Sequence, residues 1–165
     1  MTEQDVPVGN DYLYTNNYKK AKDEILVLSQ NIRSVKANGN KLKDLCKDTN
    51  ADIICLQETW NTDLLIDGYK TLSVNRQKRG GGISILSRQN LNFQIQAQIS
   101  NKNIELMSAK SDTLSIINVY RPPTGKISEF IEQIKDTLNK TDNQQTIIMG
   151  DFNINFNTPT KHSKE

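Results

Sequence analysis

Apolar positions near the start of the domain form two short, unbroken runs. Ile25 to Leu28 and Ile53 to Leu56 have the length and the continuous apolar character of strands buried on both faces. Between the runs, after Asn38-Gly39-Asn40, apolar positions recur at helical spacing: Leu42, Leu45 and Cys46. The pattern predicts a strand-helix-strand unit, and such units usually pair their strands in parallel.

The next part of the chain predicts several short strands, then a helix and one more strand. Strand candidates separated by polar turns cover residues 69–74, 82–86, 91–97, 104–109 and 114–120, and they indicate a meander. Pro122-Pro123 ends the last of them, because proline lacks the N–H that pairs in a sheet. An amphipathic helix is expected from the apolar positions that follow: Ile127, Phe130, Ile131, Ile134 and Leu138. Thr146 to Met149 is the final buried strand.

Length and composition place these elements in one domain. A chain of 165 residues forms one ordinary core. We assign residues 23–165 to this domain and residues 1–22 to a flexible polar leader. No apolar run approaches the roughly 20 residues of a membrane span, and residues 1–10 are not followed by the apolar core of a signal peptide. We therefore expect an intracellular protein without a membrane partner.

Charge and cysteine content exclude little. A net charge of +2 tolerates nucleic acid as a partner but does not require it. Cys46 and Cys55 lie at apolar positions of the predicted helix and strand. Buried cysteines of this kind usually act as small hydrophobic residues, so we expect neither a disulfide nor a reactive thiol.

Polar residues follow the buried runs at the point where each run ends. The first run leads to Asn31, the second to Glu58, and the last to Asp151 and Asn153, while the strand before the two prolines ends in Tyr120. In sheets built from crossover units, ligands gather at the carboxyl ends of the strands. Each residue alone is more often a helix cap or a turn residue, but several together are costly to bury without a ligand. The set suits a hard divalent cation and the phosphate oxygens that it holds.

Five sequence blocks in fixed order resemble a known family. They are Ser29-Gln30-Asn31-Ile32-Arg33-Ser34, Leu56-Gln57-Glu58-Thr59-Trp60, Arg79-Gly80-Gly81-Gly82-Ile83, Asn118-Val119-Tyr120-Arg121-Pro122-Pro123 and Gly150-Asp151-Phe152-Asn153. The series resembles the apurinic-endonuclease-like domain of non-LTR retrotransposons, within the endonuclease/exonuclease/phosphatase superfamily. The resemblance implies an α/β fold with two face-packed β-sheets flanked by helices, a four-layer sandwich that is incomplete at its C-terminus.

The resemblance also implies a role for each strand-end residue. Glu58 matches the metal-binding glutamate, and Asn31 matches the asparagine near the metal and the phosphate. Tyr120 matches the tyrosine that contacts the scissile phosphate. Asp151 matches the aspartate that lies at the metal site and orients or activates the attacking water, and Asn153 matches the asparagine that holds the phosphoryl oxygens. The implied cofactor is Mg²⁺, with Mn²⁺ as an alternative.

Four further residues are candidates for binding the substrate. Arg33 and Arg121 lie within the matched blocks, Arg79 precedes the three glycines in a basic turn, and Trp60 follows the metal-binding block. A basic turn before glycines can approach a DNA phosphate, although a solvated hairpin turn explains Arg79 equally well. Trp60 can stack against nucleic acid, but a single tryptophan is more often packing.

One part of the family pattern has no counterpart in this sequence. The family ends with a Ser-Asp-His-type block, and an earlier aspartate orients its histidine. His162 is the only histidine here, and it lies in a polar tail where an exposed side chain is expected. Residues 161–165 have the character of a helix that is begun and not completed. We therefore expect a C-terminally truncated chain that cuts DNA poorly or not at all.

The leading functional prediction is a Mg²⁺-dependent DNA endonuclease that nicks double-stranded DNA for retrotransposon insertion. Such an enzyme acts in the nucleus, and a reverse transcriptase domain is the candidate partner in the full-length protein. Two alternatives stay open. One is a non-catalytic remnant that keeps the fold, with or without DNA affinity, and the other is a small-molecule or lipid phosphodiesterase of the same superfamily.

Overall fold

The computed structural model describes residues 24–60, 64–76, 80–141 and 145–155. The predicted leader lies outside the described residues. The elements are β1 Val27–Asn31, α1 Val35–Thr49, β2 Ile53–Gln57, β3 Tyr69–Val74, β4 Ile83–Arg88, a short 3₁₀ helix at Gln89–Leu91, β5 Gln94–Ser100, β6 Glu105–Lys110, β7 Ser115–Tyr120, α2 Ile127–Leu138 and β8 Thr146–Asp151. No helix in these ranges is long and apolar enough to cross a membrane.

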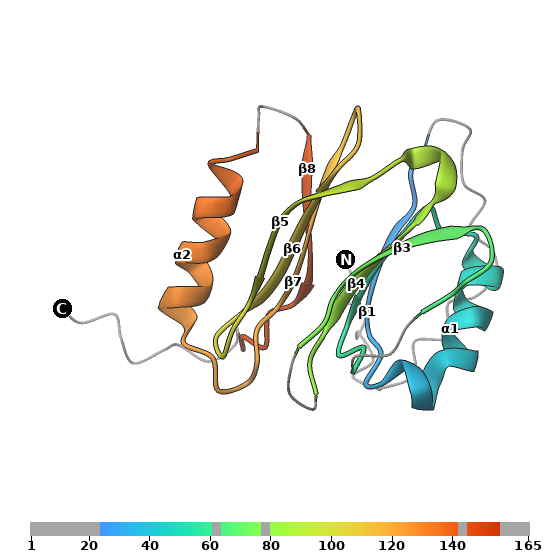
Figure 1. The fold of residues 1–165 in the computed structure, drawn as a ribbon. Coiled ribbons are helices and arrows are strands. Elements are labelled where there is room, and N and C mark those ends of the chain that lie inside the picture. The colour runs from blue at the N-terminus through green and yellow to red at the C-terminus, as the bar shows by residue number, and fades with distance from the viewer. Residues whose placement is uncertain (1–23, 61–63, 77–79, 142–144, 156–165) are drawn as a thin grey trace, which may run out of the picture.

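Two four-stranded sheets pack face to face, with one helix on the outer side of each (Figure 1). The first sheet has the order β1-β2-β4-β3, and the second has the order β5-β6-β7-β8. β1 and β2 are parallel, which confirms the predicted strand-helix-strand unit, and β7 and β8 are also parallel. The α/β fold with face-packed sheets is therefore confirmed.

The prediction of one continuous meander was wrong. The chain leaves the first sheet after β4, and only β5, β6 and β7 form an antiparallel meander in the second sheet. Local alternation marks each strand but carries no information on which sheet it joins, because both sheets bury the same kinds of side chain.

Alternation along the strands divides the core into layers. In β2, Ile53 and Cys55 face the second sheet, whereas Ile54 and Leu56 face α1. In the second sheet, Ile116 lies in the layer between the sheets and its neighbour Ile117 packs with α2. Because both faces of the central strands are covered, these strands are apolar throughout, which explains the unbroken runs in the sequence.

Helix α1 begins earlier than the sequence pattern suggested. The Oγ atom of Ser34 accepts a hydrogen bond from the N–H of Ala37 (3.3 Å), and this cap starts the helix at Val35. Val35 is buried, and Gly39, which we had placed before the helix, lies inside it. A good N-cap and a buried first residue outweigh the weak helical preference of glycine.

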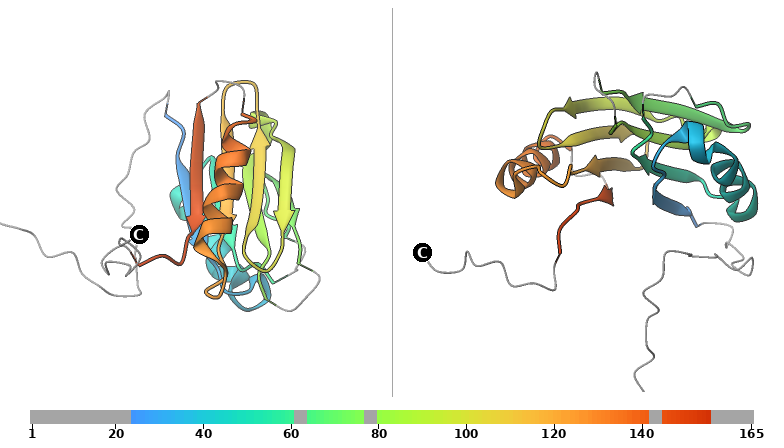
Figure 2. Two further views of the ribbon diagram at one scale, coloured as in Figure 1. Left: turned by 90° about the vertical axis from the view of Figure 1, so that its left-hand side faces the viewer. Right: turned by 90° about the horizontal axis from the view of Figure 1, so that it is seen from below.

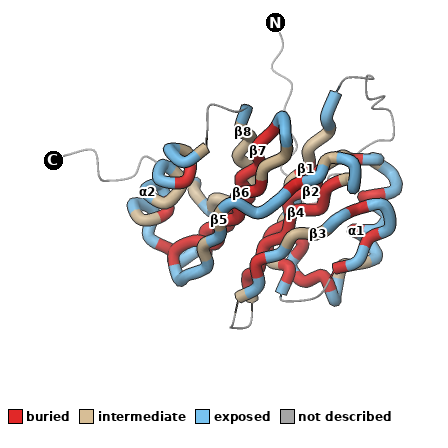
Figure 3. The backbone as a smooth tube through the Cα atoms, turned by 45° about the horizontal axis from the view of Figure 1, so that its top comes forward, coloured by how far each residue is buried: buried red, intermediate tan, exposed pale blue. Residues whose placement is uncertain are grey.

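β1 and β8 are the strands at which the two sheets adjoin. Each lies at the end of its sheet and pairs with one strand, and the two strands contact each other (Figure 2). Figure 3 shows that β8 is half-buried along its length, whereas its neighbour β7 is fully buried. This contact brings the carboxyl ends of strands from both sheets to one place.

Candidate functional site

Four of the predicted site residues meet where β1, β2, β7 and β8 end. The Nδ2 group of Asn31 donates hydrogen bonds to Glu58 Oε1 and to Asp151 Oδ2, both at 2.8 Å. The hydroxyl of Tyr120 donates to the same Glu58 oxygen at 3.3 Å. An amide thus bridges two carboxylates from different sheets, at the edge where the sequence predicted a ligand site.

Matching turns follow the two adjoining strands. The Oδ1 atom of Asn31 accepts the N–H of Arg33 (3.2 Å), and the Oδ1 atom of Asp151 accepts the N–H of Asn153 (3.1 Å). In each turn the residue two positions on has a φ angle of 48°. Asparagine and aspartate side chains commonly close such turns. Here the Oδ1 atom of each side chain accepts a backbone N–H, while Nδ2 of Asn31 and Oδ2 of Asp151 face the site.

Positive φ angles concentrate around this cluster. Among the described residues other than glycine, seven have a positive φ, and five of them lie at these strand ends: Arg33, Ser34, Glu58, Trp60 and Asn153. The left-handed conformation costs an ordinary residue roughly 1 kcal/mol or more. Strain that gathers at one place and is held there by the surrounding structure is typical of a functional site.

A buried polar network fixes the distance between the two sheets beneath the cluster. Gln57 donates to the side-chain oxygen of Asn118 (2.7 Å), and Asn118 donates to the carbonyl oxygens of Leu56 (3.0 Å) and Ser84 (2.9 Å). Asn118 is fully buried. Since Gln57 precedes Glu58, the network sets the position of the β2 end against the second sheet.

The Tyr120 hydroxyl acts as a donor in this site. Its burial and, secondly, the carboxylate of Glu58 raise the pKa of Tyr120 to about 12. The phenol therefore keeps its proton at neutral pH and can donate to an anionic oxygen.

The oxygen donors of the site suit a hard divalent cation. Mg²⁺ is usually held by one or two carboxylates together with waters and substrate phosphates, and Glu58 and Asp151 supply two carboxylates linked through Asn31. Within the described ranges, no group of three or more His, Cys, Asp or Glu side chains that could hold a metal ion is present. An ion at the two carboxylates would therefore need waters or phosphate oxygens as its remaining ligands.

Arg121 faces the protein's own backbone. Its side chain is buried, and its guanidinium donates to the carbonyl oxygens of Phe152 (2.7 Å), Gly125 (2.5 Å) and Asn153. The Asn153 amide in turn donates to the Arg121 carbonyl (2.8 Å). Substrate binding by Arg121 stays a prediction, whereas these contacts show it holding the turn that carries Asn153.

We expect Arg121→Lys to destabilise the protein by about 2 kcal/mol. The planar fork of the guanidinium reaches three separate carbonyls, whereas a single ammonium group cannot. Urea denaturation measures the change. Arg33→Lys is the matched control, since Arg33 is exposed and exposed substitutions usually stay within about 0.5 kcal/mol. Equal stability of the two variants would contradict the positioning role of Arg121.

Of the remaining substrate-binding candidates, the structure describes Arg33 and Trp60. Arg33 is exposed beside Asn31, and Trp60 is 40% exposed two residues beyond Glu58. Both are therefore accessible at the rim of the site. Arg79 and His162 lie outside the described residues.

Sequence reasoning missed two buried polar residues near the site. Asn118 lies between two apolar residues of β7, and Glu105 begins β6 with no exposed surface. A polar residue inside an otherwise apolar strand is the signal that could have identified Asn118. Glu105 gives no comparable signal, because a charged residue after a turn is ordinary in a sequence.

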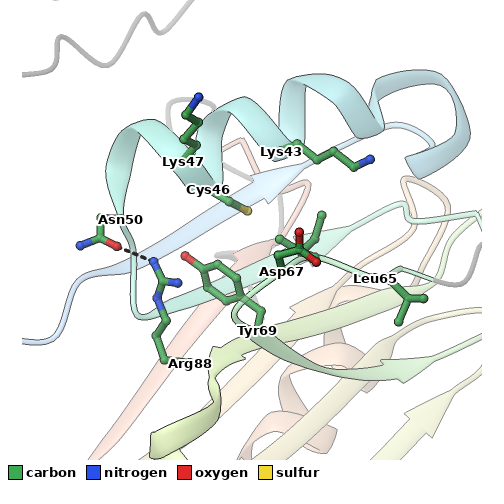
Figure 4. A pocket seen from close by; sticks show the side chains of 9 residues that line it. Lys43, Cys46, Lys47, Asn50, Leu65, Asp67, Tyr69 and Arg88 are labelled. Atoms are coloured by element: carbon green, nitrogen blue, oxygen red, sulfur yellow. Dashed lines mark hydrogen bonds between the residues drawn. The ribbon is translucent and has the colours of Figure 1, made fainter.

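A cavity of about 510 Å³ lies between α1 and β3, away from this cluster (Figure 4). Its wall includes Arg88, which stacks 4.2 Å from the ring centre of Tyr69 and donates to the side chain of Asn50 (2.5 Å). Asn50 caps the carboxyl end of α1, so this part of the wall lies at the strand ends opposite to Glu58. Burial raises the pKa of the Cys46 thiol in the same wall to about 11, so the thiol keeps its proton at neutral pH.

Both cysteines are free and buried, as expected.

The sequence resemblance implied a four-layer α/β sandwich for a phosphodiesterase fold. The structure has this architecture, and asparagine, glutamate, tyrosine and aspartate side chains converge at its strand ends. The model of the Endonuclease/Exonuclease/phosphatase family matches residues 28–164, and the chain belongs to this family.

Solved structures share the fold at low sequence identity. An AP endonuclease from Archaeoglobus fulgidus is 18% identical with a TM-score of 0.61, over 77% of this chain and 56% of that one. The endonuclease domain of TRAS1, a telomere-specific non-LTR retrotransposon, is 21% identical with a TM-score of 0.62, over 80% and 60%. The 3′ phosphatase NExo from Neisseria, bound to product DNA hairpin, is 19% identical with a TM-score of 0.54, over 79% and 58%. The chain thus spans less than two thirds of the length of these proteins.

Proposed function

We propose that this domain is a divalent-metal-dependent phosphodiester hydrolase that acts on DNA. The observation that carries the proposal is the bridge from Asn31 to the Glu58 and Asp151 carboxylates, which gathers three side chains from both sheets at one strand edge. Glu58 and Asp151 would hold Mg²⁺, or Mn²⁺ in its place. The bound ion would polarise the phosphate and stabilise charge on the leaving oxygen.

The side chains have distinct tasks in this proposal. Tyr120 donates its hydroxyl proton in a hydrogen bond to a phosphate oxygen, and Asn153 donates its second amide hydrogen to a phosphoryl oxygen. Asn31 holds the Glu58 and Asp151 carboxylates together beside the phosphate. Asp151 accepts a proton from the attacking water, which makes the water a better nucleophile. Arg33 and Trp60 lie at the rim, where they can contact the DNA backbone and a base; Arg79 keeps its proposed phosphate contact.

The similar proteins support DNA as the substrate, and we propose that it is duplex DNA. They include an AP endonuclease, a phosphatase bound to a DNA hairpin and the endonuclease domain of a retrotransposon. The Asn-Val-Tyr-Arg-Pro-Pro and triple-glycine blocks favour the last of these. We therefore propose nicking of target DNA for retrotransposon insertion, in the nucleus and together with a reverse transcriptase domain.

A nicking assay under single-turnover conditions tests the function. The chain is incubated in excess with supercoiled plasmid in Mg²⁺, in Mn²⁺ and in EDTA, alongside bis(p-nitrophenyl) phosphate as a diester with a good leaving group. We expect slow plasmid nicking and faster release of nitrophenolate, both abolished by EDTA. The good leaving group needs less stabilisation, so its hydrolysis depends less on the histidine block that has no counterpart here.

Asp151→Asn is the internal background for this assay, because it keeps the side-chain shape but cannot accept the proton. Metal-dependent hydrolysis of either substrate that disappears in Asp151→Asn supports the proposal. Rates that are the same in the variant and in the original chain would overturn it and favour a non-catalytic remnant. Hydrolysis of the small diester without DNA binding or nicking would favour a small-molecule phosphodiesterase.

A further inference from the structure

A fully buried glutamate lies behind the candidate site. Glu105 begins β6 with no exposed surface, and its Oε2 atom accepts the N–H of Gly82 at 2.5 Å. Its other carboxylate oxygen lies 3.5 Å from Nε of Arg76. Burying a carboxylate costs free energy, and this burial raises the pKa of Glu105. The two carboxylate oxygens thus face Gly82 and Arg76, so the side chain connects β6 with the segment before β4.

The carboxylate is fitted to the three-glycine turn. Gly80, Gly81 and Gly82 have φ angles of 83°, 71° and 86°, which favour glycine at all three positions. A Cβ atom on Gly81 would collide with Oε1 of Glu105. The glycines therefore serve both the backbone conformation and the close approach of this one side chain.

The same turn holds the backbone that follows Glu58. The carbonyl of Gly82 accepts the N–H of Thr59 at 3.1 Å, and the carbonyl of Gly81 accepts the N–H of Trp60 at 2.8 Å. Glu58 and Trp60 have φ angles of 55° and 59°, a conformation that needs support from outside the segment. The contacts thus run from the buried carboxylate through the glycine turn to the strained segment.

Glu105 is also tied to the second sheet. It pairs with Tyr120 in the register of β6 and β7, and the Tyr120 hydroxyl donates to the Glu58 carboxylate. One residue therefore links both supports of Glu58, the glycine turn on one side and the phenol on the other.

We propose that Glu105 is a positioning residue, which through Gly81 and Gly82 holds Glu58 in place for metal binding and Trp60 in place at the rim. The part of this inference that concerns the metal rests on the proposed function. The part that concerns the position of Trp60 does not.

Trp60 supplies a direct readout, because it is the only tryptophan of the chain. Acrylamide quenching of its fluorescence measures how accessible the indole is, and this accessibility increases when the segment that carries Trp60 is held less firmly. Glu105→Met fills most of the space but offers no acceptor to Gly82, so we expect quenching of Trp60 to increase and Mg²⁺ affinity, measured by calorimetry, to fall about tenfold. Glu105→Gln keeps an acceptor oxygen for Gly82 and is expected to restore both properties.

Phe93→Leu is the control for a general loss of stability. Phe93 is fully buried and follows β4 at the end opposite to Glu58, so this variant should unfold more easily while Trp60 quenching and Mg²⁺ affinity stay unchanged. If Glu105→Met does not fold, Glu105→Asp, which keeps the charge and shortens the reach, takes its place with the same expectation.

The outcomes separate the two levels of the proposal. Unchanged Trp60 quenching in folded Glu105→Met, or an equal increase in Phe93→Leu, would overturn the positioning role. Failure of Glu105→Gln to restore Trp60 would also overturn it, since the acceptor oxygen would then not be what matters. No measurable Mg²⁺ binding by the original chain would count against the proposed function, and the Trp60 measurement would still decide the role of Glu105.

Discussion

Glu58→Gln is expected to weaken Mg²⁺ binding by at least about tenfold, and Glu58→Ala to do the same, because a hard cation prefers an anionic oxygen that neither an amide nor a methyl group provides. Glutamine keeps the shape of the side chain and can still contact Asn31, so a loss in this variant reports the charge rather than the packing. Isothermal calorimetry with Mg²⁺ and with Mn²⁺ measures the affinity.

The control must separate a lost ligand from a changed net charge. Glu132→Gln removes the same charge from an exposed position of α2 and should leave the affinity within the error of the measurement, since exposed charges at a distance are screened by salt. Unchanged affinity in Glu58→Gln and Glu58→Ala would place the metal ligand elsewhere. Equal losses in Glu58→Gln and Glu132→Gln would reduce the effect to general electrostatics.

Gly150→Ala is expected to prevent stable folding, with a loss above about 4 kcal/mol, the range that only severe structural conflicts reach. Gly150 pairs with Val119 in the register of β7 and β8, and its φ angle is 149°. A Cβ atom there would collide with the carbonyl group of Val119. The conflict involves backbone, so no side-chain rotation relieves it, and β8 would separate from β7 immediately before Asp151.

Gly39→Ala tests the opposite expectation on the same chain. Gly39 lies inside α1, where an added Cβ would be 4.0 Å from the nearest atom, a side-chain carbon of Val35. Alanine should therefore stabilise the protein by roughly 0.5–1 kcal/mol, because it loses less conformational freedom in a helix than glycine does. Urea denaturation of both variants measures the difference. A loss below about 1 kcal/mol in Gly150→Ala would show that β8 tolerates displacement at this position.

The site residues divide according to how each was recognised. Asn31, Glu58, Tyr120 and Asp151 were predicted because each follows a buried run, and the structure brings these four together. Their chemical roles stay proposals until metal binding and hydrolysis are measured. Arg121 was predicted from its place in a sequence block. Two of the three backbone carbonyls that it contacts, those of Phe152 and Asn153, lie in the turn after β8, which is distant in the sequence.

The sequence by itself determined the elements, the fold class and the strand ends that carry polar side chains. Apolar runs and helical spacing depend on local burial, which is written directly into neighbouring residues. The order of five blocks then pointed to the family that the match over residues 28–164 shows, although the overall identity to the AP endonuclease and the TRAS1 domain is only 18% and 21%.

Only the tertiary structure decided which strands share a sheet and what holds the site together. The chain passes to the second sheet after β4. The contact of β1 with β8 and the hydrogen bond from Gly82 to the Glu105 carboxylate each join residues far apart in the chain. A sequence pattern records whether a position is buried, but it does not record its partner, and the same apolar or charged residue satisfies many different neighbours. The assignment of strands to sheets, the packing of the sheets on each other and the orientation of buried polar groups are therefore fixed by the tertiary structure.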